Sequence, residues 1–232
     1  MRKIPISVSL AIPTYNNERT VVKELLKCEE LLIKLVTDYE ILVGEDYGKD
    51  KTREILKTQF LNRSKFRIFL NSKNLGIAGN VRNLYKKATK DYVIFFSVDG
   101  DWSVKDIERL IMHCYKHTCD VVIGKRENKN YTPYRKLISG AYNTLPKLFF
   151  NIKTIDAGSI KIFKRNLITK NYPTSKSVFM EAEIIIRAYK RGGKISSIPV
   201  SFNNKTRKTG TGGNIRLVIA SFLDLLKLRA SL

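Results

Sequence analysis

Two aspartates, Asp99 and Asp101, follow the most apolar stretch of the chain and are separated only by Gly100. Carboxylates at positions i and i+2 near the end of a strand can bind one hard divalent cation, which prefers oxygen ligands and keeps water and phosphate oxygens in its shell. Asp and Gly are also common in turns, so a purely structural turn is the alternative. The pair predicts a Mg²⁺ or Mn²⁺ site that faces a phosphorylated ligand.

Polar residues also end the strand-like runs that precede this pair. In chain order they are the segment 14–18, Glu45 and Asp46, and the segment 74–76. Ligands of open parallel sheets bind beyond the carboxyl ends of the strands. We therefore expect the acidic groups to gather at one edge of a sheet, although the protein as a whole is basic.

The elements that would position these residues alternate along the first half of the chain. Apolar runs predict strands at 6–12, 39–43, 66–70, 92–98 and 120–123, and helical spacing predicts helices at 19–36, 51–60, 77–88 and 104–117. Apolar strands alternating with amphipathic helices indicate a parallel sheet covered by helices on both faces.

The alternation stops after residue 124. We expect strands at 159–163 and 194–200, a helix at 180–191, a Gly-rich and Lys-rich loop at 203–214, and two basic amphipathic helices at 134–150 and 215–228. Helices of the last kind either pack on the core or lie on a membrane.

Length and cysteine content narrow the class of protein. The 232 residues suffice for one large domain, or for a domain with a small appendage. Cys28, Cys114 and Cys119 are odd in number and lack metal-ligand spacing, so we expect reduced core residues. No run approaches the roughly 18 uncharged apolar residues of a transmembrane helix, and the first apolar run is too short for a signal peptide. The sequence predicts a cytoplasmic protein.

The charge is strongly positive, with 43 Lys and Arg against 21 Asp and Glu and a net charge of +22. Such a field favours nucleic acid, anionic lipid surfaces or phosphorylated substrates, unless the lysine-rich composition has no specific ligand. The sequence carries no nucleic-acid recognition motif, and acidic strand ends repel phosphates unless a metal intervenes. We therefore expect no nucleic-acid partner and keep that class as the remote alternative.

The order and spacing of several motifs resemble a known enzyme family. They are IPTYNNE (12–18), EILVGEDYGKDKT (40–52), NLG (74–76), DYVIFFSVDGDW (91–102), DVVIGKR (120–126), DAGSIKIFKR (156–165), FMEAEIIIRAYKRGGKISSIPVSF (179–202) and RKTGT (207–211). The chain resembles the family 2 glycosyltransferases, and within them the polyprenyl-phosphate sugar transferases of the dolichyl-phosphate mannose synthase type. The resemblance implies an α/β protein with the GT-A fold, a Rossmann-like and mostly parallel central sheet flanked by helices, with C-terminal amphipathic helices. It implies a catalytic domain at 1–212, followed by an amphipathic helix at 213–232.

The resemblance also implies roles for individual residues. The nucleotide-sugar would contact Pro13, Tyr15, Glu18, Glu45, Asp46 and Asp99, while Asp99 and Asp101 would bind the metal against the diphosphate. Three positions depart from the family pattern: Glu45 replaces the usual Asp, Tyr47 stands where a small residue is usual, and Ser103 where the polyprenyl subgroup commonly has Gln. The departures at Glu45 and Tyr47 leave the base preference open, and the departure at Ser103 leaves open the metal contact that the Gln makes in that subgroup.

The chemistry of the acceptor decides which other side chains are needed. The leaving diphosphate gains negative charge, which Lys205 and Arg207 would stabilise. A sugar hydroxyl as acceptor needs a general base, for which Glu183 or Glu181 is a candidate, unless Glu183 simply pairs with Arg187 one helical turn away. A lipid phosphate is already anionic and needs cations instead, which would be Lys125, Arg126, Arg135, Lys136, Lys205 and Arg207.

The sequence thus predicts a metal-dependent inverting glycosyltransferase. Its donor would be a UDP- or GDP-sugar and its acceptor a polyprenyl or dolichyl phosphate, with the protein peripheral at the cytosolic membrane face. Transfer to a saccharide hydroxyl is the alternative within the same chemistry, and a catalytically silent nucleotide-sugar-binding domain is a third reading. The sugar, the nucleotide and the oligomeric state stay open.

Overall fold

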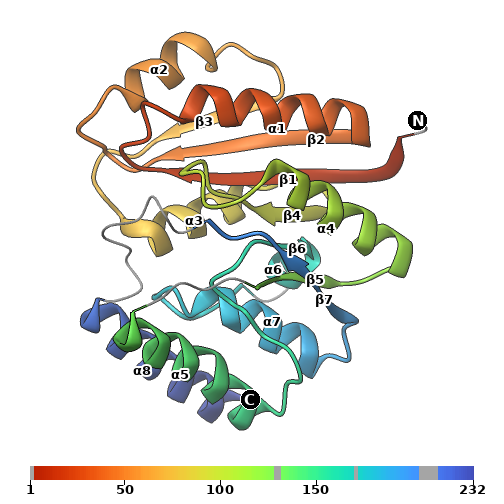
Figure 1. Ribbon diagram of the computed structural model, residues 1–232, viewed down its shortest axis with the longest axis vertical. Helices are drawn as coiled ribbons and strands as arrows, with labels where there is room; N and C mark the ends of the chain where they lie inside the picture. Colours follow the sequence, from red (N-terminus) through yellow and green to blue (C-terminus); the bar gives the residue numbers. More distant parts are fainter. Residues whose placement is uncertain (1–2, 128–131, 170–171, 204–213) are drawn as a thin grey trace.

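A seven-stranded sheet in the order β3-β2-β1-β4-β6-β5-β7 forms the middle of the described part of the molecule (Figure 1). The computed structural model describes residues 3–127, 132–169, 172–203 and 214–232. The strands are β1 (Ile4–Thr14), β2 (Val36–Glu45), β3 (Phe66–Leu70), β4 (Tyr92–Phe95), β5 (Val121–Arg126), β6 (Lys161–Lys164) and β7 (Ile195–Val200). The helices are α1 (Val21–Leu35), α2 (Thr52–Gln59), α3 (Gly76–Lys87), α4 (Val104–His117), α5 (Pro133–Phe150), α6 (Asn166–Thr169), α7 (Met180–Lys190) and α8 (Ile215–Ser231).

The prediction of a mostly parallel sheet is confirmed. β1 pairs in parallel with β2 and β4, β2 with β3, and β5 with β7. β6 is the exception, because it runs antiparallel to both β4 and β5. The amino end of β6 therefore lies beside the carboxyl end of β4, where Lys161 pairs with Phe95.

Two apolar cores cover the two faces of the sheet. One core joins alternate residues of β1 to α1, α2 and α4, and the other joins the sheet to α3, α5, α7 and α8. β4 contributes Ile94 to the first core and Val93 to the second. A strand buried on both faces has to be apolar throughout, which explains the run that precedes Asp99.

The observed elements differ from the predicted ones mainly at their ends. β4 was expected to reach Val98 and ends at Phe95, although Phe96 and Val98 are fully buried. The reason is pairing: Phe95 faces Lys161, the first residue of β6, so β4 has no neighbour on that side beyond it. The four-residue helix α6 was not predicted.

The helix α3 is held against β2 by a close backbone approach. The Asn80 side chain donates from Nδ2 to the Gly44 carbonyl at 2.7 Å. A Cβ on Gly44 would lie 2.2 Å from Asn80 Oδ1, so a larger residue there would have to displace the Asn80 amide and break this hydrogen bond. This contact fixes α3 with its first turn at the carboxyl edge of the sheet.

The last helix, α8, packs on the rest of the protein through one side. Leu225 and Leu228 are buried in the second core, and Asp224 accepts a hydrogen bond from the Ser177 backbone N–H at 2.9 Å. The expected boundary between residues 212 and 213 lies outside the described residues, as does most of the expected loop at 203–214. None of the helices in the described ranges combines the length and apolar character needed to cross a lipid bilayer.

Candidate active site

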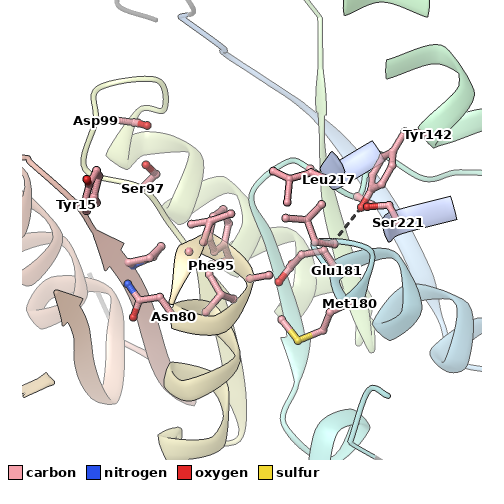
Figure 2. A pocket seen from close by; sticks show the side chains of 18 of the residues that line it. Tyr15, Asn80, Phe95, Ser97, Asp99, Tyr142, Met180, Glu181, Leu217 and Ser221 are labelled. Carbon is pink, nitrogen blue, oxygen red and sulfur yellow. Dashed lines mark hydrogen bonds between the residues drawn. The ribbon is translucent and has the colours of Figure 1, made fainter. Parts of the chain in front are cut away.

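A cavity of about 580 Å³ opens beyond the carboxyl ends of β1 and β4 (Figure 2). Residues of α3 line it as well, and α5, α7 and α8 line it from the other side. The side chains of Tyr15, Ser97 and Asp99 lie on one side of the cavity, and those of Tyr142, Glu181 and Ser221 lie on the other (Figure 2). The cavity thus joins the sheet edge that the sequence singled out to the two basic helices.

Four of the residues predicted to contact the nucleotide-sugar line this cavity: Pro13, Tyr15, Asp46 and Asp99. The Tyr15 side chain is exposed, whereas Asp46 is buried. Asp46 Oδ1 accepts hydrogen bonds from Asn71 Nδ2 at 2.9 Å and from the Leu75 backbone N–H at 2.8 Å. These bonds hold the carboxylate in one orientation at the cavity edge.

Two further nucleotide candidates lie away from the cavity. Glu45 is fully buried and accepts hydrogen bonds from Arg53 Nε and from the Gly48 backbone N–H, each at 2.6 Å. Glu18 is exposed and accepts from the Lys51 backbone N–H at 3.0 Å. In this structure both carboxylates hold the loop that follows β2, and their contact with a nucleotide stays a prediction.

The loop after β2 also contains the departure at Tyr47. This residue has a positive φ of 58°, and its exposed ring lies 5.3 Å from the Arg53 guanidinium. A left-handed backbone is unusual for a bulky residue, and glycine would adopt it at lower cost than Tyr47.

Asp99, Gly100 and Asp101 form a turn, which we call the DGD turn, and its two aspartates lie close to each other. Asp99 lines the cavity, while Asp101 is buried and donates its backbone N–H to Asp99 Oδ1 at 3.3 Å. Gly100 between them has a φ of 82°, which glycine adopts without strain. Ser103 caps α4, because its Oγ accepts from the Lys105 backbone N–H at 3.3 Å.

The DGD turn suits a divalent ion of a particular kind. Within the described ranges, no group of three or more His, Cys, Asp or Glu side chains is arranged to hold a metal. Among the described residues, the carboxylates of Asp99 and Asp101 are therefore the groups that would hold an ion. Mg²⁺ and Mn²⁺ accept such a set when phosphate and water oxygens complete the shell, so the residues present fit an ion that binds together with a diphosphate.

The basic residues predicted for the acceptor divide into two groups. Arg126 and Arg135 line the cavity, whereas Lys125 and Lys136 are exposed outside it. Arg126 donates from Nε to Asp156 Oδ2 at 3.1 Å and pairs through Nη2 with the other oxygen of that carboxylate. Its position at the cavity is therefore fixed. Lys205 and Arg207 lie outside the described residues.

The two glutamates considered as a general base lie in different surroundings. Glu183 is fully buried and does not line the cavity. Its Oε1 accepts from Arg187 Nε at 2.6 Å and from the Thr174 backbone N–H at 2.9 Å, and its Oε2 accepts from the Ser175 backbone N–H at 2.8 Å. This geometry favours the alternative reading, in which Glu183 pairs with Arg187.

Glu181, in contrast, lines the cavity and forms a cluster with two residues that the sequence analysis did not single out. Its Oε2 pairs with Lys161 Nζ and accepts from the Tyr85 hydroxyl at 3.2 Å. Lys161 is fully buried, and burial raises the pKa of the Tyr85 hydroxyl, with the neighbouring Glu181 charge adding to the effect. A lone lysine inside an apolar strand indicates a buried ion pair, and this signal was available in the sequence.

The sequence matches known proteins over most of its length. The model of the family described as Glycosyl transferase family 2 matches residues 9–174. The dolichyl-phosphate beta-glucosyltransferase ALG5A of Trichomonas vaginalis is 30% identical, and the match covers 96% of this chain and 73% of that protein. The glycosyltransferase AglD of Haloferax volcanii is 25% identical over 209 residues. That match covers 86% of this chain and 34% of AglD, so the chain spans about a third of that relative.

Solved structures resemble the fold at low sequence identity. Glucosyl-3-phosphoglycerate synthase from Mycobacterium tuberculosis, in complex with Mn²⁺, UDP and glucosyl-3-phosphoglycerate, gives a TM-score of 0.72 at 14% identity, and the match covers 98% of this chain and 81% of that chain. Residues 1–349 of S. aureus TarS, in complex with UDP-GlcNAc, give a TM-score of 0.63 at 16% identity, covering 94% of this chain and 67% of that chain. At these identities the likeness concerns the arrangement of helices and strands.

Proposed function

The chain belongs to glycosyl transferase family 2, and we propose that it transfers a sugar from a UDP- or GDP-sugar to a polyprenyl phosphate at a membrane surface. The expected glycosyltransferase class is confirmed by the family match and by the relatives. The expected GT-A fold is confirmed by the family match and by the likeness to the solved structures. The identities of the donor, the metal and the acceptor are what we propose.

One observation carries the proposal: a single cavity is lined by Asp46 and Asp99 at the sheet edge and by two arginines, Arg126 of β5 and Arg135 of α5. Pro13, Tyr15 and Asp46 would hold the nucleotide. Arg126 and Arg135 would hold an anionic acceptor. The relative of Trichomonas vaginalis, named as a dolichyl-phosphate beta-glucosyltransferase, supports a lipid phosphate as that acceptor.

The proposed reaction is a displacement with inversion at the anomeric carbon. An oxygen of the acceptor phosphate forms a bond to that carbon, and the electron pair of the broken bond leaves with the nucleoside diphosphate. The acceptor needs no general base, because a phosphate monoester with a second pKa of about 6 is already anionic at neutral pH. Asp99 and Asp101 would hold a Mg²⁺ or Mn²⁺ ion, which when bound stabilises the charge on the diphosphate as a Lewis acid. The solved synthase that contains Mn²⁺ and UDP supports this assignment.

Transfer to a saccharide hydroxyl is the second candidate, and Glu181 favours it. This carboxylate lines the cavity, and its Oε1 is not engaged with Lys161 or Tyr85, so it is the atom that would accept a proton. A hydroxyl acceptor requires such a base, whereas a lipid phosphate does not.

The choice of acceptor tests the proposal. The protein is incubated with radiolabelled UDP-glucose or GDP-mannose, with Mn²⁺ or Mg²⁺, and with a short polyprenyl phosphate, the matching unphosphorylated polyprenol or a soluble oligosaccharide. We expect labelled product with the polyprenyl phosphate alone. Transfer to the oligosaccharide but not to the polyprenyl phosphate would contradict the lipid acceptor and support the second candidate.

An exposed apolar face supports a location at a membrane surface. α5 and α8 lie side by side at the end of the molecule opposite α2 (Figure 1). On α8 the exposed residues Ile215, Ile219, Phe222 and Leu226 recur at helical spacing. On α5, Leu137 and Leu148 are 73% and 74% exposed and lie three turns apart, therefore on one side of the helix.

Basic residues flank this apolar face. They are Lys136 and Lys147 on α5, and Arg216, Lys227 and Arg229 on α8, all of them exposed. Apolar side chains bordered by Lys and Arg are typical of a helix that lies on anionic lipid. We propose that this face, which we call the α5/α8 face, rests on the membrane from which the acceptor enters the cavity.

Acidic residues introduced into the α5/α8 face are expected to release the protein from vesicles. The double variant Ile219→Glu and Phe222→Glu removes apolar area and adds two negative charges, so we expect at least a tenfold lower affinity for phosphatidylglycerol vesicles in a co-sedimentation assay. The matched control is Leu61→Glu with Tyr115→Glu, which alters two exposed apolar residues away from α5 and α8. Equal loss of binding in both variants would mean that only net charge matters, and would contradict this face as the contact.

A further inference from the structure

Three polar side chains at the helical end of the cavity have an atom without a hydrogen-bond partner. Within the described part of the chain, these buried atoms are Asn143 Oδ1 on α5, Glu181 Oε1 on α7 and Ser221 Oγ on α8. All three residues line the one cavity. Figure 2 shows Glu181 and Ser221 on the side of the cavity opposite Tyr15 and Asp99. A buried polar atom without a hydrogen bond destabilises the folded protein. Three such atoms in the lining of one cavity therefore indicate a ligand that forms hydrogen bonds with them.

The chemistry of these atoms restricts the ligand. Asn143 donates from Nδ2 to the Ser139 carbonyl at 2.9 Å. The Oδ1 of the same amide can still accept a hydrogen bond. Glu181 uses Oε2 for Lys161 and Tyr85, which leaves Oε1 as an acceptor. The Ser221 hydroxyl both accepts and donates. These three side chains therefore suit a ligand that carries hydrogen-bond donors.

The charge at Glu181 leads to the same conclusion for these three side chains, while Arg126 and Arg135, which line the same cavity, would serve an anionic group. The Glu181 carboxylate is neutralised by Lys161, which is fully buried and lies 5.4 Å from the Phe95 ring. An ion pair with no net charge does not attract a phosphate, whereas its free carboxylate oxygen accepts strongly from a hydroxyl group. A neutral ligand with several hydroxyl groups fits these atoms better than a diphosphate or a lipid tail.

We propose that Glu181, Asn143 and Ser221 form the subsite that binds the hydroxyl groups of the transferred sugar, and that this subsite sets which sugar the enzyme accepts. The inference rests on the proposed function, because it takes the sugar from a nucleotide-sugar whose diphosphate lies near Asp99. Lys161 and Tyr85 are positioning residues, since they act by fixing the Glu181 carboxylate.

Binding measurements separate this subsite from the rest of the donor site. Calorimetry compares the affinity of each protein for UDP-glucose with that for UDP, and for GDP-mannose with that for GDP, in the presence of Mn²⁺. For Ser221→Ala and Asn143→Ala we expect the nucleotide-sugar to bind about three- to tenfold more weakly, the loss of one neutral hydrogen bond, while the nucleoside diphosphate binds as before. Glu181→Gln is expected to have a larger effect of the same kind, because a charged acceptor is lost.

A control variant and the wild-type protein distinguish a failure of the subsite from a failure of the proposed function. Ser231→Ala alters another α8 serine, whose hydroxyl donates to the Leu228 carbonyl at 3.0 Å outside the cavity, and it should leave both affinities unchanged. If Glu181→Gln does not fold, the Ser221→Ala and Asn143→Ala variants alone test whether the subsite binds the sugar. Unchanged preference for nucleotide-sugar over nucleoside diphosphate in these two variants would overturn the subsite and would show that their atoms serve packing or acceptor binding. Failure of the wild type to bind any nucleotide-sugar would overturn the proposed function itself.

Discussion

Replacing Asp99 by Asn should lower the rate of sugar transfer by about 10²- to 10³-fold, the usual cost of losing one group that stabilises charge in a transition state. Asp99 lines the cavity, and its Oδ1 already accepts the Asp101 backbone N–H. An amide can keep that hydrogen bond while it removes the negative charge needed to bind a divalent ion. Initial rates over a range of Mn²⁺ concentrations measure the effect, and we expect the variant to need more metal for half-maximal rate.

The matched control for this prediction is Asp91→Asn. Asp91 is exposed, directly precedes β4 and lies at the opposite end of that strand, where its Oδ2 accepts from the Ser7 hydroxyl at 2.7 Å. The control should transfer sugar at the wild-type rate, and both variants should melt near the wild-type temperature. Full activity of Asp99→Asn, or activity that persists in excess chelator, would contradict the metal role of the DGD turn.

Glu183→Ala should lower the free energy of unfolding by about 3–5 kcal/mol. The substitution leaves the Arg187 guanidinium and the backbone N–H groups of Thr174 and Ser175 without their shared acceptor in the protein interior. Urea unfolding followed by circular dichroism measures the loss. The matched control is Glu30→Ala, because Glu30 and Lys34 form a pair with the same i,i+4 spacing and the same 2.6 Å distance on an exposed surface. Its effect should be much smaller.

The difference in unfolding free energy between the wild type and Glu183→Ala should depend on pH. Burial by itself raises the pKa of Glu183, but the hydrogen bonds from Ser175, Thr174 and Arg187 outweigh burial and lower the pKa below its ordinary value of 4.5. Such a group stabilises the folded state above its ordinary pKa, and this contribution is lost as the pH falls through the lowered value. The difference between wild type and Glu183→Ala should therefore narrow below about pH 4. A variant that keeps wild-type stability and loses sugar transfer would instead support the catalytic role first expected from the sequence.

The general plan of the fold could be predicted because it depends on periodicity. Strands buried on both faces produce uninterrupted apolar runs, and the helices that cover them produce apolar residues at helical spacing. Those two patterns located β1 to β5 and α1 to α4 within a few residues. The rule that ligands of open parallel sheets bind beyond the carboxyl ends of the strands then singled out Asp99, which lies in the loop after β4.

The choice between Glu181 and Glu183 could not be made in the same way. Both lie in the first turn of α7 and are two residues apart, so their side chains point to opposite sides of the helix. The sequence shows that one of them faces the protein interior, but the rotation of α7 about its axis depends on packing against the sheet. In the structure that rotation brings Glu181 to the cavity and turns Glu183 toward Thr174 and Ser175.

The role of Lys161 escaped the sequence analysis for a topological reason. Residues that follow parallel strands were the ones considered, whereas β6 runs in the opposite direction and brings its first residue to the site. Strand direction leaves no mark on the hydrophobic pattern of a short buried strand. A rule based on strand ends therefore misses every residue that an antiparallel strand contributes from its beginning.

The helix α8 serves two parts of the molecule at once. Leu217, Val218 and Ser221 form part of the cavity wall, while Ile219, Phe222 and Leu223 are exposed on other sides of the same 17-residue helix. A contact that shifts the helix from outside therefore also moves the wall. Whatever free energy links the two sides acts in both directions, so a ligand in the cavity changes the affinity of the outer side by the same factor by which a bound surface changes the affinity of the cavity. Substrate occupancy would then determine how long the protein stays on that surface.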